Sequence, residues 1–358
     1  MKRKIITIIG ARPQFVKAAV ISRILLAHDD VEEILVHTGQ HYDHNMSEIF
    51  FEEMEIPKPK YNLSINGLDH GAMTGQMLEK IEEVIKIENP EWVLVYGDTN
   101  STIAGALAAR KQHIKVAHIE AGLRSFNMRM PEEVNRILTD RISDILFAPT
   151  QRAIDNLKLE GFDNLDINVV RSGDVMLDAG MFYAQRSKEL ATLPSEFFEG
   201  DFILCTLHRA ENTDDKERLT SIVNALNTIH ESTRVVMPLH PRTSGLIEKY
   251  GLELKVDLID PVGYFDMIEL LKNCSLVMTD SGGLQKEAYF FKKNCVTMRD
   301  ETEWVELVEN GFNLLSGANG DLIIEHTQTM LSKVSDFSSQ LYGDGHAGEQ
   351  IVEILLEN

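Results

Sequence analysis

Four residues that can accept or donate a proton stand at points where the sequence predicts a strand end or a helix start. Asp98, Glu120 and His208 each follow a short apolar run, and Glu132 follows Pro131 at the start of a helical pattern. Carboxylates and an imidazole that face one substrate can move a proton on its two faces. The set predicts acid–base chemistry, with these four side chains as the candidate catalytic residues.

Structural alternatives exist for some of these residues. Asp98 could cap a helix that begins near Ser101, and Glu132 or Glu133 could be a favourable charge in the first turn of a helix. Glu120 has little local structural use, because its neighbours Ile119 and Ala121-Gly122 offer it nothing to cap. Glu120 is therefore the strongest candidate of the four.

Two turns predict the binding of an anion. In Gly10-Ala11-Arg12-Pro13 the proline suits the first turn of a helix, whose free N–H groups, with Arg12 and Lys17, would attract a phosphate. In Ser281-Gly282-Gly283 two glycines would let backbone amides approach a phosphate at a second helix start, and Glu287 could accept hydrogen bonds from ribose hydroxyls. Neither turn has the GxGxxG spacing of a dinucleotide fold, and no GxxxxGK[ST] loop is present, so we expect no nicotinamide cofactor.

Metal binding is the weaker interpretation of the histidines. His37, His41 and His44 lie close together in the sequence, but no cysteine or carboxylate set completes a site with the spacing of a finger or a helical motif. We therefore predict that the enzyme needs neither a metal nor another cofactor.

Composition limits the class of protein. A chain of 358 residues fits two domains better than one, and 35 basic against 56 acidic residues give a net charge of −21, which disfavours nucleic acid and anionic membranes as partners. No apolar stretch approaches the ~20 residues of a membrane span. The three cysteines, Cys205, Cys274 and Cys295, form no CxxC pair, which suits a reducing cytosol and predicts a cytoplasmic protein.

The elements that must position these residues follow the rhythm of βαβ units. Short apolar runs alternate with helical patterns, which predicts an α/β fold with parallel sheets and functional residues at the carboxyl ends of strands. The expected strands are 5–9, 34–37, 92–96, 116–119, 145–148, 167–170, 202–206, 235–239, 258–259, 276–279 and 295–298, and the clearest helices are 15–27, 73–87 and 102–111. We expect an N-terminal Rossmann-like domain over 1–172, a C-terminal one over 173–345, and a helix at 346–358 that packs back on the first.

Taken together, the motifs resemble the non-hydrolysing UDP-N-acetylglucosamine 2-epimerase family over nearly the whole chain. The matching segments are Gly10-x-Arg12-Pro13, Gly97-Asp98-Thr99, Glu120-Ala121-Gly122-Leu123-Arg124, Pro131-Glu132-Glu133-x-Asn135-Arg136, His208-Arg209, Ser281-Gly282-Gly283 and Met298-Arg299-Asp300-x-Thr302-Glu303. The resemblance implies two doubly wound Rossmann-like domains of glycosyltransferase-B type with a central cleft, and a homodimer.

The resemblance also assigns roles. Asp98, Glu120, Glu132 and His208 match the family's catalytic residues, and the UDP-binding positions match Arg12, Lys17, His240, Ser281, Gly282, Gly283 and Glu287. Apart from the resemblance, we predict that Arg129, Arg136 and Asn212 contact the sugar.

Three positions depart from ordinary members of that family. Gln14 replaces a glutamate, Trp304 replaces an arginine that contacts UDP, and Asp43 replaces a glutamine of the effector site of regulated members. With the segments 39–51 and 127–130, these departures resemble the branch that acts on UDP-2,3-diacetamido-2,3-dideoxyglucuronate in O-antigen sugar synthesis. The carboxylate of this substrate could bind Arg129, although Arg129 could instead pair with Glu132 or Glu133.

The implied reaction eliminates UDP to give a 2-acetamidoglycal and adds it back after protonation on the other face of carbon 2. UDP-N-acetylglucosamine is the alternative substrate. A glycosyltransferase, a hydrolysing epimerase and a nucleotide-sugar sensor without catalysis are the alternative functions, and the sensor would have no use for four acid–base residues.

Overall fold

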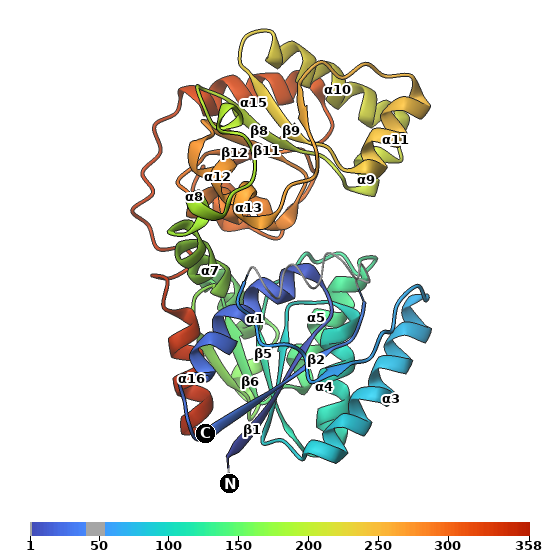
Figure 1. Ribbon diagram of the computed structural model, residues 1–358, viewed down its shortest axis with the longest axis vertical. Helices are drawn as coiled ribbons and strands as arrows, with labels where there is room; N and C mark the ends of the chain where they lie inside the picture. The colour runs from blue at the N-terminus through green and yellow to red at the C-terminus, as the bar shows by residue number, and fades with distance from the viewer. Residues whose placement is uncertain (1, 41–53) are drawn as a thin grey trace. The chain divides into compact units, whose positions relative to one another are not determined.

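The computed structural model describes residues 2–40 and 54–358 and divides into two units (Figure 1). Unit 1 comprises Met1–Ala179 and Leu341–Asn358, and unit 2 comprises Gly180–Gln340. Each unit has its own parallel sheet covered by helices, so the predicted fold class of two Rossmann-like α/β domains is confirmed.

Unit 1 contains a seven-stranded sheet of order β3-β2-β1-β4-β5-β6-β7 in which all neighbours are parallel. Its strands are β1 (Arg3–Ile9), β2 (Val31–His37), β3 (Tyr61–Asn62), β4 (Trp92–Tyr96), β5 (Lys115–Ile119), β6 (Ile145–Ala148) and β7 (Asn168–Arg171). Its helices are α1 (Arg12–Leu25), α3 (His70–Glu88), α4 (Asn100–Lys111), α5 (Pro131–Ile142), α6 (Gln151–Leu159) and α16 (Ala347–Glu357), with α7 (Val175–Ala184) crossing into unit 2.

Unit 2 repeats the arrangement with six parallel strands in the order β10-β9-β8-β11-β12-β13. Its strands are β8 (Ile203–Thr206), β9 (Val235–Pro238), β10 (Asp257–Ile259), β11 (Leu276–Thr279), β12 (Cys295–Thr297) and β13 (Asn313–Leu315). Its helices are α8 (Ser187–Leu190), α9 (Ala210–Thr213), α10 (Lys216–His230), α11 (Pro241–Tyr250), α12 (Tyr264–Asn273), α13 (Gly282–Phe290), α14 (Val305–Glu309) and α15 (Gly320–Ser332).

Both strand orders reverse direction at one point, between β1 and β4 in unit 1 and between β8 and β11 in unit 2. The crevice outside the carboxyl ends of the strands at such a point is where doubly wound sheets bind ligands. The predicted functional residues that come directly after strands follow β1, β4 and β5 in unit 1 and β8, β9 and β11 in unit 2, so they lie at or beside these points.

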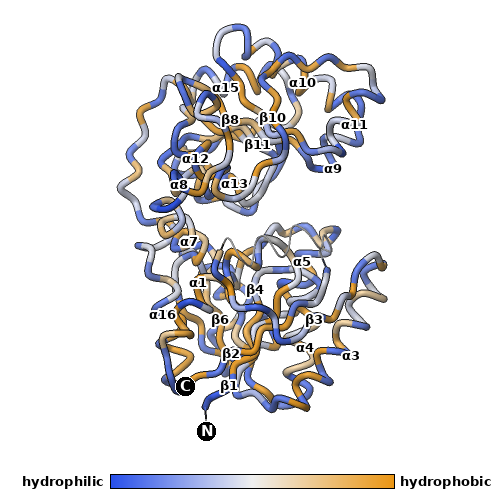
Figure 2. The backbone as a smooth tube through the Cα atoms, in the orientation of Figure 1, coloured by the Kyte–Doolittle hydropathy of each residue, from blue (hydrophilic) through white to orange (hydrophobic). Residues whose placement is uncertain are grey.

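The central strands are buried on both faces because helices cover both sides of each sheet. All five residues of β4 are buried, as are the last five residues of β1. Figure 2 shows the hydrophobic residues running along strands such as β1 and β2. Continuous rather than alternating apolar runs are therefore the pattern that these strands leave in the sequence.

The strand boundaries agree with those expected to within two residues except for β2, and β2, α1 and α3 begin three residues earlier than expected. Two short edge strands are additional. They are too short to stand out from the sequence: β3 is Tyr61–Asn62 and β13 is Asn313–Leu315. One local expectation changes: α4 is capped by Thr99, whose hydroxyl accepts a hydrogen bond from the Thr102 amide, so Asp98 is not the cap.

The helix α16 is held against unit 1 at both of its ends. The Gly348 amide donates to Asp178 Oδ2 at 2.7 Å, and the Leu356 carbonyl accepts from the Arg3 guanidinium. Between these ends Ile351, Val352 and Leu355 are buried. The side chains of Val20 and Ile24 on α1 lie so close to Gly348 that a Cβ there would meet them at 2.6 and 2.8 Å.

Candidate active site

The first turn of unit 1 is held by Gln14, a fully buried side chain on α1. Its Oε1 accepts hydrogen bonds from the amides of Gly10 and Ala11 at 2.8 and 3.0 Å, and its Nε2 donates to the Tyr96 carbonyl at 2.8 Å and to Thr99 Oγ1 at 3.0 Å. One amide therefore joins the turn after β1 to the turn after β4. This bridge between the two turns needs both a hydrogen-bond donor and an acceptor, and a glutamate would supply both only when protonated.

Glu120 lies at the end of β5 and adopts a left-handed backbone conformation, with φ of 70°. This conformation strains any residue other than glycine and occurs preferentially at functional sites. Its carboxylate forms an ion pair with the ammonium of Lys17 on α1, and the two side chains are only 10% and 8% exposed. The structure thus brings the predicted catalytic carboxylate and a predicted UDP contact together in one pair.

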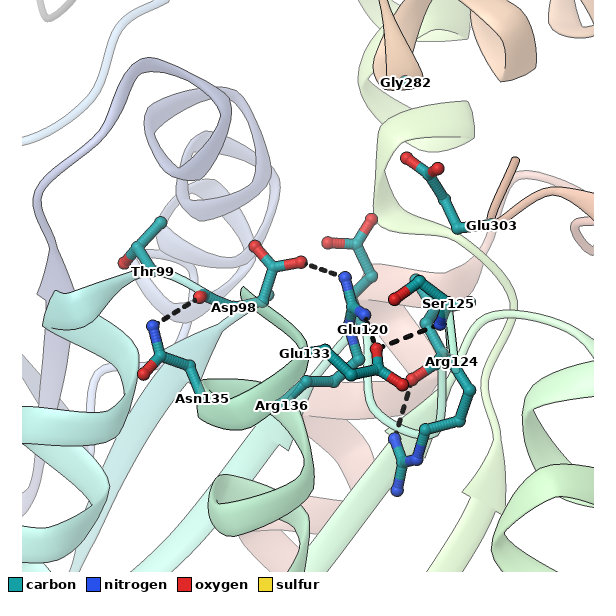
Figure 3. Close-up of polar contacts among 12 residues, drawn as sticks. Asp98, Thr99, Glu120, Arg124, Ser125, Glu133, Asn135, Arg136, Gly282 and Glu303 are labelled. Atoms are coloured by element: carbon teal, nitrogen blue, oxygen red, sulfur yellow. Dashed lines mark hydrogen bonds and ion pairs between the residues drawn. The ribbon is translucent and has the colours of Figure 1, made fainter. Parts of the chain in front are cut away.

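Gly97 permits this approach. Its φ is 61°, and a Cβ at this position would lie 3.1 Å from Glu120 Oε2 and 3.5 Å from Lys17 Nζ. Asp98 follows at once, half-buried, and accepts a hydrogen bond from Arg136 (Figure 3). Two of the predicted carboxylates therefore stand at the ends of neighbouring strands.

The pKa of Asp98 is raised above its ordinary value. Burial is the main cause, and the nearby Glu120 carboxylate adds to it, while Arg136 and Lys17 oppose the shift. A carboxyl group whose pKa moves towards neutral is better matched to proton transfer at physiological pH.

Arg136 and Glu133 form the support for Asp98. Arg136 is buried and donates to both carboxylates, one from each of its terminal nitrogens. Glu133 is buried as well and accepts from the Ser125 amide at 2.9 Å (Figure 3) and from the Phe126 amide at 2.9 Å. Arg136, predicted as a sugar contact, is thus placed behind Asp98, and its contact with a sugar remains a prediction.

Glu132 and Arg129 are both exposed, in contrast to Glu133. The Glu133 carboxylate is bonded to the chain around it, whereas the Glu132 side chain forms no hydrogen bond or ion pair with the residues that the structure describes. Within residues 54–358, Arg129 forms no ion pair with Glu132 or Glu133, and only its amide is held, by Asn127 Oδ1 at 3.1 Å. The pairing considered as an alternative for Arg129 is therefore absent there.

In unit 2, His208 follows β8 and is oriented by Asp280, a fully buried carboxylate after β11. Asp280 accepts from the amides of His208 and Arg209 at 3.1 and 2.9 Å, and its Oδ1 lies 3.3 Å from His208 Nδ1. The pKa of His208 is lowered, chiefly by partial burial, with repulsion from Arg209 and His240, and Asp280 opposes the shift. Sequence analysis missed this role of Asp280, although its position directly after a strand was a usable signal.

Asn212 lies behind Asp280, and its contact with the sugar remains a prediction. It is fully buried, its Nδ2 donates to the Met298 carbonyl at 2.8 Å and to Asp280 at 3.3 Å, and its Oδ1 accepts from Arg218 at 3.1 Å. Because both atoms of its side-chain amide already bond to the protein, this geometry favours a role in holding Asp280 in place.

The predicted phosphate turn opens α13 as expected. Ser281 is the N-cap residue, but its hydroxyl forms no capping bond, and Gly283 has open space where a Cβ would be. A Cβ on Gly282 would collide with the Glu303 carboxylate, which accepts from the buried Arg299 at 2.9 Å. The helix start thus keeps its first amide groups open beside the Glu303 carboxylate and Arg209, whose Nη2 would lie 3.5 Å from the same Cβ.

Trp304 stabilises this turn from behind. Its indole Nε1 donates to the Gly282 carbonyl at 2.9 Å, and Lys286 Nζ lies 4.5 Å from the centre of its ring system. Trp304 is buried and supports the backbone of α13. The family resemblance implies an arginine that contacts UDP at this position. Glu287 lies further along α13, half-buried.

The remaining predicted residues are placed as follows. His240 caps α11, with its Nδ1 accepting from the Arg242 amide at 3.2 Å, and it is exposed. The side chain of Arg12, and residues His41, Asp43 and His44, lie outside the described part of the chain. Among the described residues no three histidine, cysteine or acidic side chains are grouped to hold a metal, and no helix is long and apolar enough to cross a membrane.

A second residue that sequence analysis missed is His118, because it was assigned only to a strand. It is fully buried on β5, between Asp140 and the Gly97 carbonyl. Its position two residues before Glu120 was the available signal.

Comparison with known proteins gives a consistent result over the whole chain. The family model described as UDP-N-acetylglucosamine 2-epimerase matches residues 23–356. The UDP-2,3-diacetamido-2,3-dideoxy-D-glucuronate 2-epimerase of Pseudomonas aeruginosa is 62% identical over 353 residues, which cover 98% of this chain and 99% of that one. The UDP-N-acetylglucosamine 2-epimerase of Methanocaldococcus jannaschii is 44% identical over 364 residues, 98% of each chain.

Solved structures agree. The crystal structure of the Methanocaldococcus jannaschii enzyme in complex with UDP-GlcNAc and UDP has a TM-score of 0.89 at 42% identity and covers 100% of both chains. The Neisseria meningitidis UDP-GlcNAc 2-epimerase bound to UDP-GlcNAc has a TM-score of 0.89 at 31% identity, over 99% of this chain and 100% of that one.

Proposed function

The chain belongs to the UDP-N-acetylglucosamine 2-epimerase family, and from this premise we propose that it inverts carbon 2 of UDP-2,3-diacetamido-2,3-dideoxyglucuronate. The observation that carries the choice of sugar is the 62% identity, over almost the full length of both chains, to an enzyme named for that substrate. The exposed Arg129 supports it, because a guanidinium can bind a carboxylate at carbon 6 through two parallel hydrogen bonds.

The reaction begins with loss of UDP, because the hydrogen on carbon 2 is not acidic enough for direct removal. As the anomeric C–O bond breaks, negative charge develops on the diphosphate, and the start of α13 with Ser281 and Gly283, together with Arg12, would stabilise it. His208, oriented by Asp280, would donate a hydrogen bond to the same group.

Removal of the carbon 2 proton then gives a 2-acetamidoglycal. Glu120 would transfer this proton on one face of the sugar, and Asp98 or Glu132 would transfer it on the other. Re-protonation from the opposite face and return of UDP to carbon 1 complete the inversion, with no net redox change. Lys17 would counter the charge of Glu120 in its ionised form.

UDP-N-acetylglucosamine is the second candidate substrate, because the solved relatives with TM-scores of 0.89 are named for complexes with it. The deciding assay is NMR of each UDP-sugar with the purified protein in deuterated water. Inversion with deuterium at carbon 2 identifies an epimerase, whereas free sugar identifies a hydrolase. No change with either sugar would refute the proposal and favour a transferase or a sensor.

Substrate choice is tested at Arg129. Arg129→Ala should lose at least ~10-fold more kcat/KM with the uronate than with UDP-N-acetylglucosamine, since a hydrogen bond to a charged group contributes ~1.5–3 kcal/mol. Arg110→Ala is the matched control, because Arg110 is an exposed arginine in the last turn of α4, at the end away from the active-site turn. Equal losses on both sugars would refute the uronate proposal and leave the epimerase itself standing.

We further propose that the enzyme is a cytoplasmic homodimer, as the family resemblance implies. Sedimentation equilibrium of the purified chain tests the dimer, and a mass of one chain at micromolar concentration would contradict it.

A further inference from the structure

His118 is a fully buried histidine to which the proposed mechanism gives no part. Its Nδ1 lies 2.7 Å from Asp140 Oδ1, and its Nε2 lies 2.7 Å from the carbonyl oxygen of Gly97. A carbonyl oxygen can only accept, so Nε2 carries a hydrogen and donates it.

Asp140 is itself fixed on every side. It accepts from Arg124 Nη1 at 2.7 Å and from the Gly122 amide at 3.2 Å, and Arg124 is held in turn by both oxygens of Glu160 at 2.7 and 2.8 Å. Burial opposes ionisation of Asp140, but His118 and Arg124 outweigh it and lower the pKa of Asp140. The ring of His118 is therefore anchored to a rigid, ionised group.

The other end of this chain of contacts is the peptide of Gly97. Its amide donates to the Ile119 carbonyl at 2.9 Å, and its carbonyl accepts from His118, so β5 holds both sides of this residue. Gly97 is also the residue against which the Glu120 carboxylate lies, and the residue that precedes Asp98. A shift of Gly97 would move both carboxylates relative to each other.

We propose that His118 is a positioning residue for epimerisation, which fixes the Gly97 carbonyl and thereby the spacing of Asp98 and Glu120. This inference rests on the proposed function. It does not require His118 to touch the sugar or to exchange a proton with it. Because misplacement of reacting groups by ~1 Å can cost ~100-fold in rate, a single hydrogen bond at this point has a large effect.

The test compares two substitutions that each retain one half of the ring. In His118→Gln the amide nitrogen can reach the place of Nε2 and keep the bond to Gly97, whereas in His118→Asn it reaches only the place of Nδ1 and keeps the contact with Asp140. We expect kcat to be at least ~10-fold higher in His118→Gln than in His118→Asn, with KM within ~3-fold and with the same affinity for UDP. A purely structural role would instead lower the melting temperature and leave the two variants with equal kcat per folded molecule, and that result would overturn the inference.

A second measurement needs no variant to fold. In the wild type labelled with ¹⁵N-histidine, NMR should show a His118 Nε2–H that is hydrogen-bonded and protected from exchange with solvent. A freely exchanging or absent Nε2–H would overturn the inference. The proposed function is tested separately, because a wild type that leaves carbon 2 of both sugars undeuterated refutes epimerisation while the ring signal still reports on the bond to Gly97.

Discussion

Two opposing effects meet at Glu120, and their magnitudes predict the outcome of Glu120→Gly. Glycine would relieve the left-handed conformation, which costs roughly 1–2 kcal/mol, but part of this gain is lost because glycine makes the unfolded chain more flexible. Removing the carboxylate also leaves the Lys17 ammonium, which is 8% exposed, without its partner, at a cost of ~3–5 kcal/mol for a buried pair. We expect Glu120→Gly to be less stable than the wild type by ~2–4 kcal/mol.

The same substitution in a Lys17→Met background reverses the expected sign. There the Glu120 carboxylate, which is only 10% exposed, already lacks its partner, so Glu120→Gly removes an unpaired charge together with the backbone strain and should stabilise the chain by at least ~1 kcal/mol. The matched control is the exposed pair Lys80–Glu83 on α3, whose side chains are 49% and 55% exposed and for which a coupling below ~1 kcal/mol is expected.

Urea unfolding at pH 7 measures these differences. The chain has two tryptophans, and in a Trp304→Phe background the remaining one, Trp92 on β4, reports on unit 1 alone. Equal destabilisation by Glu120→Gly in both backgrounds would refute the importance of the ion pair. Stabilisation by more than ~1 kcal/mol in the wild-type background would show that backbone strain dominates. Every variant without the Glu120 carboxylate should lose epimerisation by at least ~100-fold.

Three further predictions concern residues around the site and the base of the sheet. Hydrogen bonds from two lysines and a tyrosine lower the pKa of Glu88 from 4.5 to about 2, so its contribution to stability is present above pH 4.5 and is lost as the pH falls towards 2. Glu88→Gln should therefore lower the free energy of unfolding by ~1–3 kcal/mol at pH 7, and urea titrations at pH 3 should show a smaller difference between variant and wild type. Gln14→Glu should destabilise unit 1 by ~1–3 kcal/mol at pH 7, because a carboxylate would face the Tyr96 carbonyl; equal urea midpoints would contradict this. Arg136→Met removes a charge that lowers the pKa of Asp98, so the limb of the kcat/KM pH profile that reports Asp98 should move to higher pH, and an unchanged profile would count against Asp98 in catalysis.

The sequence predicts the fold well because each doubly wound sheet leaves uninterrupted apolar runs. β4, β6 and β11 were expected with the bounds that the structure has, since their residues are buried on both faces. The strands β3 and β13 were not predicted, because edge strands of two or three residues are too short to show a hydrophobic pattern.

The site was predictable as a set of residue types but not as a set of contacts. The difference between Glu132 and Glu133 lies in which one the neighbouring turn buries, and this depends on the path of residues 125–126, not on the motif. Likewise, the roles of Asp280 and His118 depend on bonds between strands far apart in sequence. Trp304 shows the same limit, because only the structure reveals that it donates to the carbonyl of Gly282.

The return of α16 to unit 1 has a consequence for synthesis of the protein on the ribosome. Unit 1 is built from two segments, and all of unit 2 is translated before the second one emerges. Until then Val20 and Ile24 on α1 lack their α16 neighbours, and Asp178 lacks the amide of Gly348. Domains generally fold as units during translation, and exposed apolar surface on an incomplete one invites aggregation. Unit 2 can therefore reach its native fold first, and nascent chains stalled before residue 347 should be the species that chaperones hold longest.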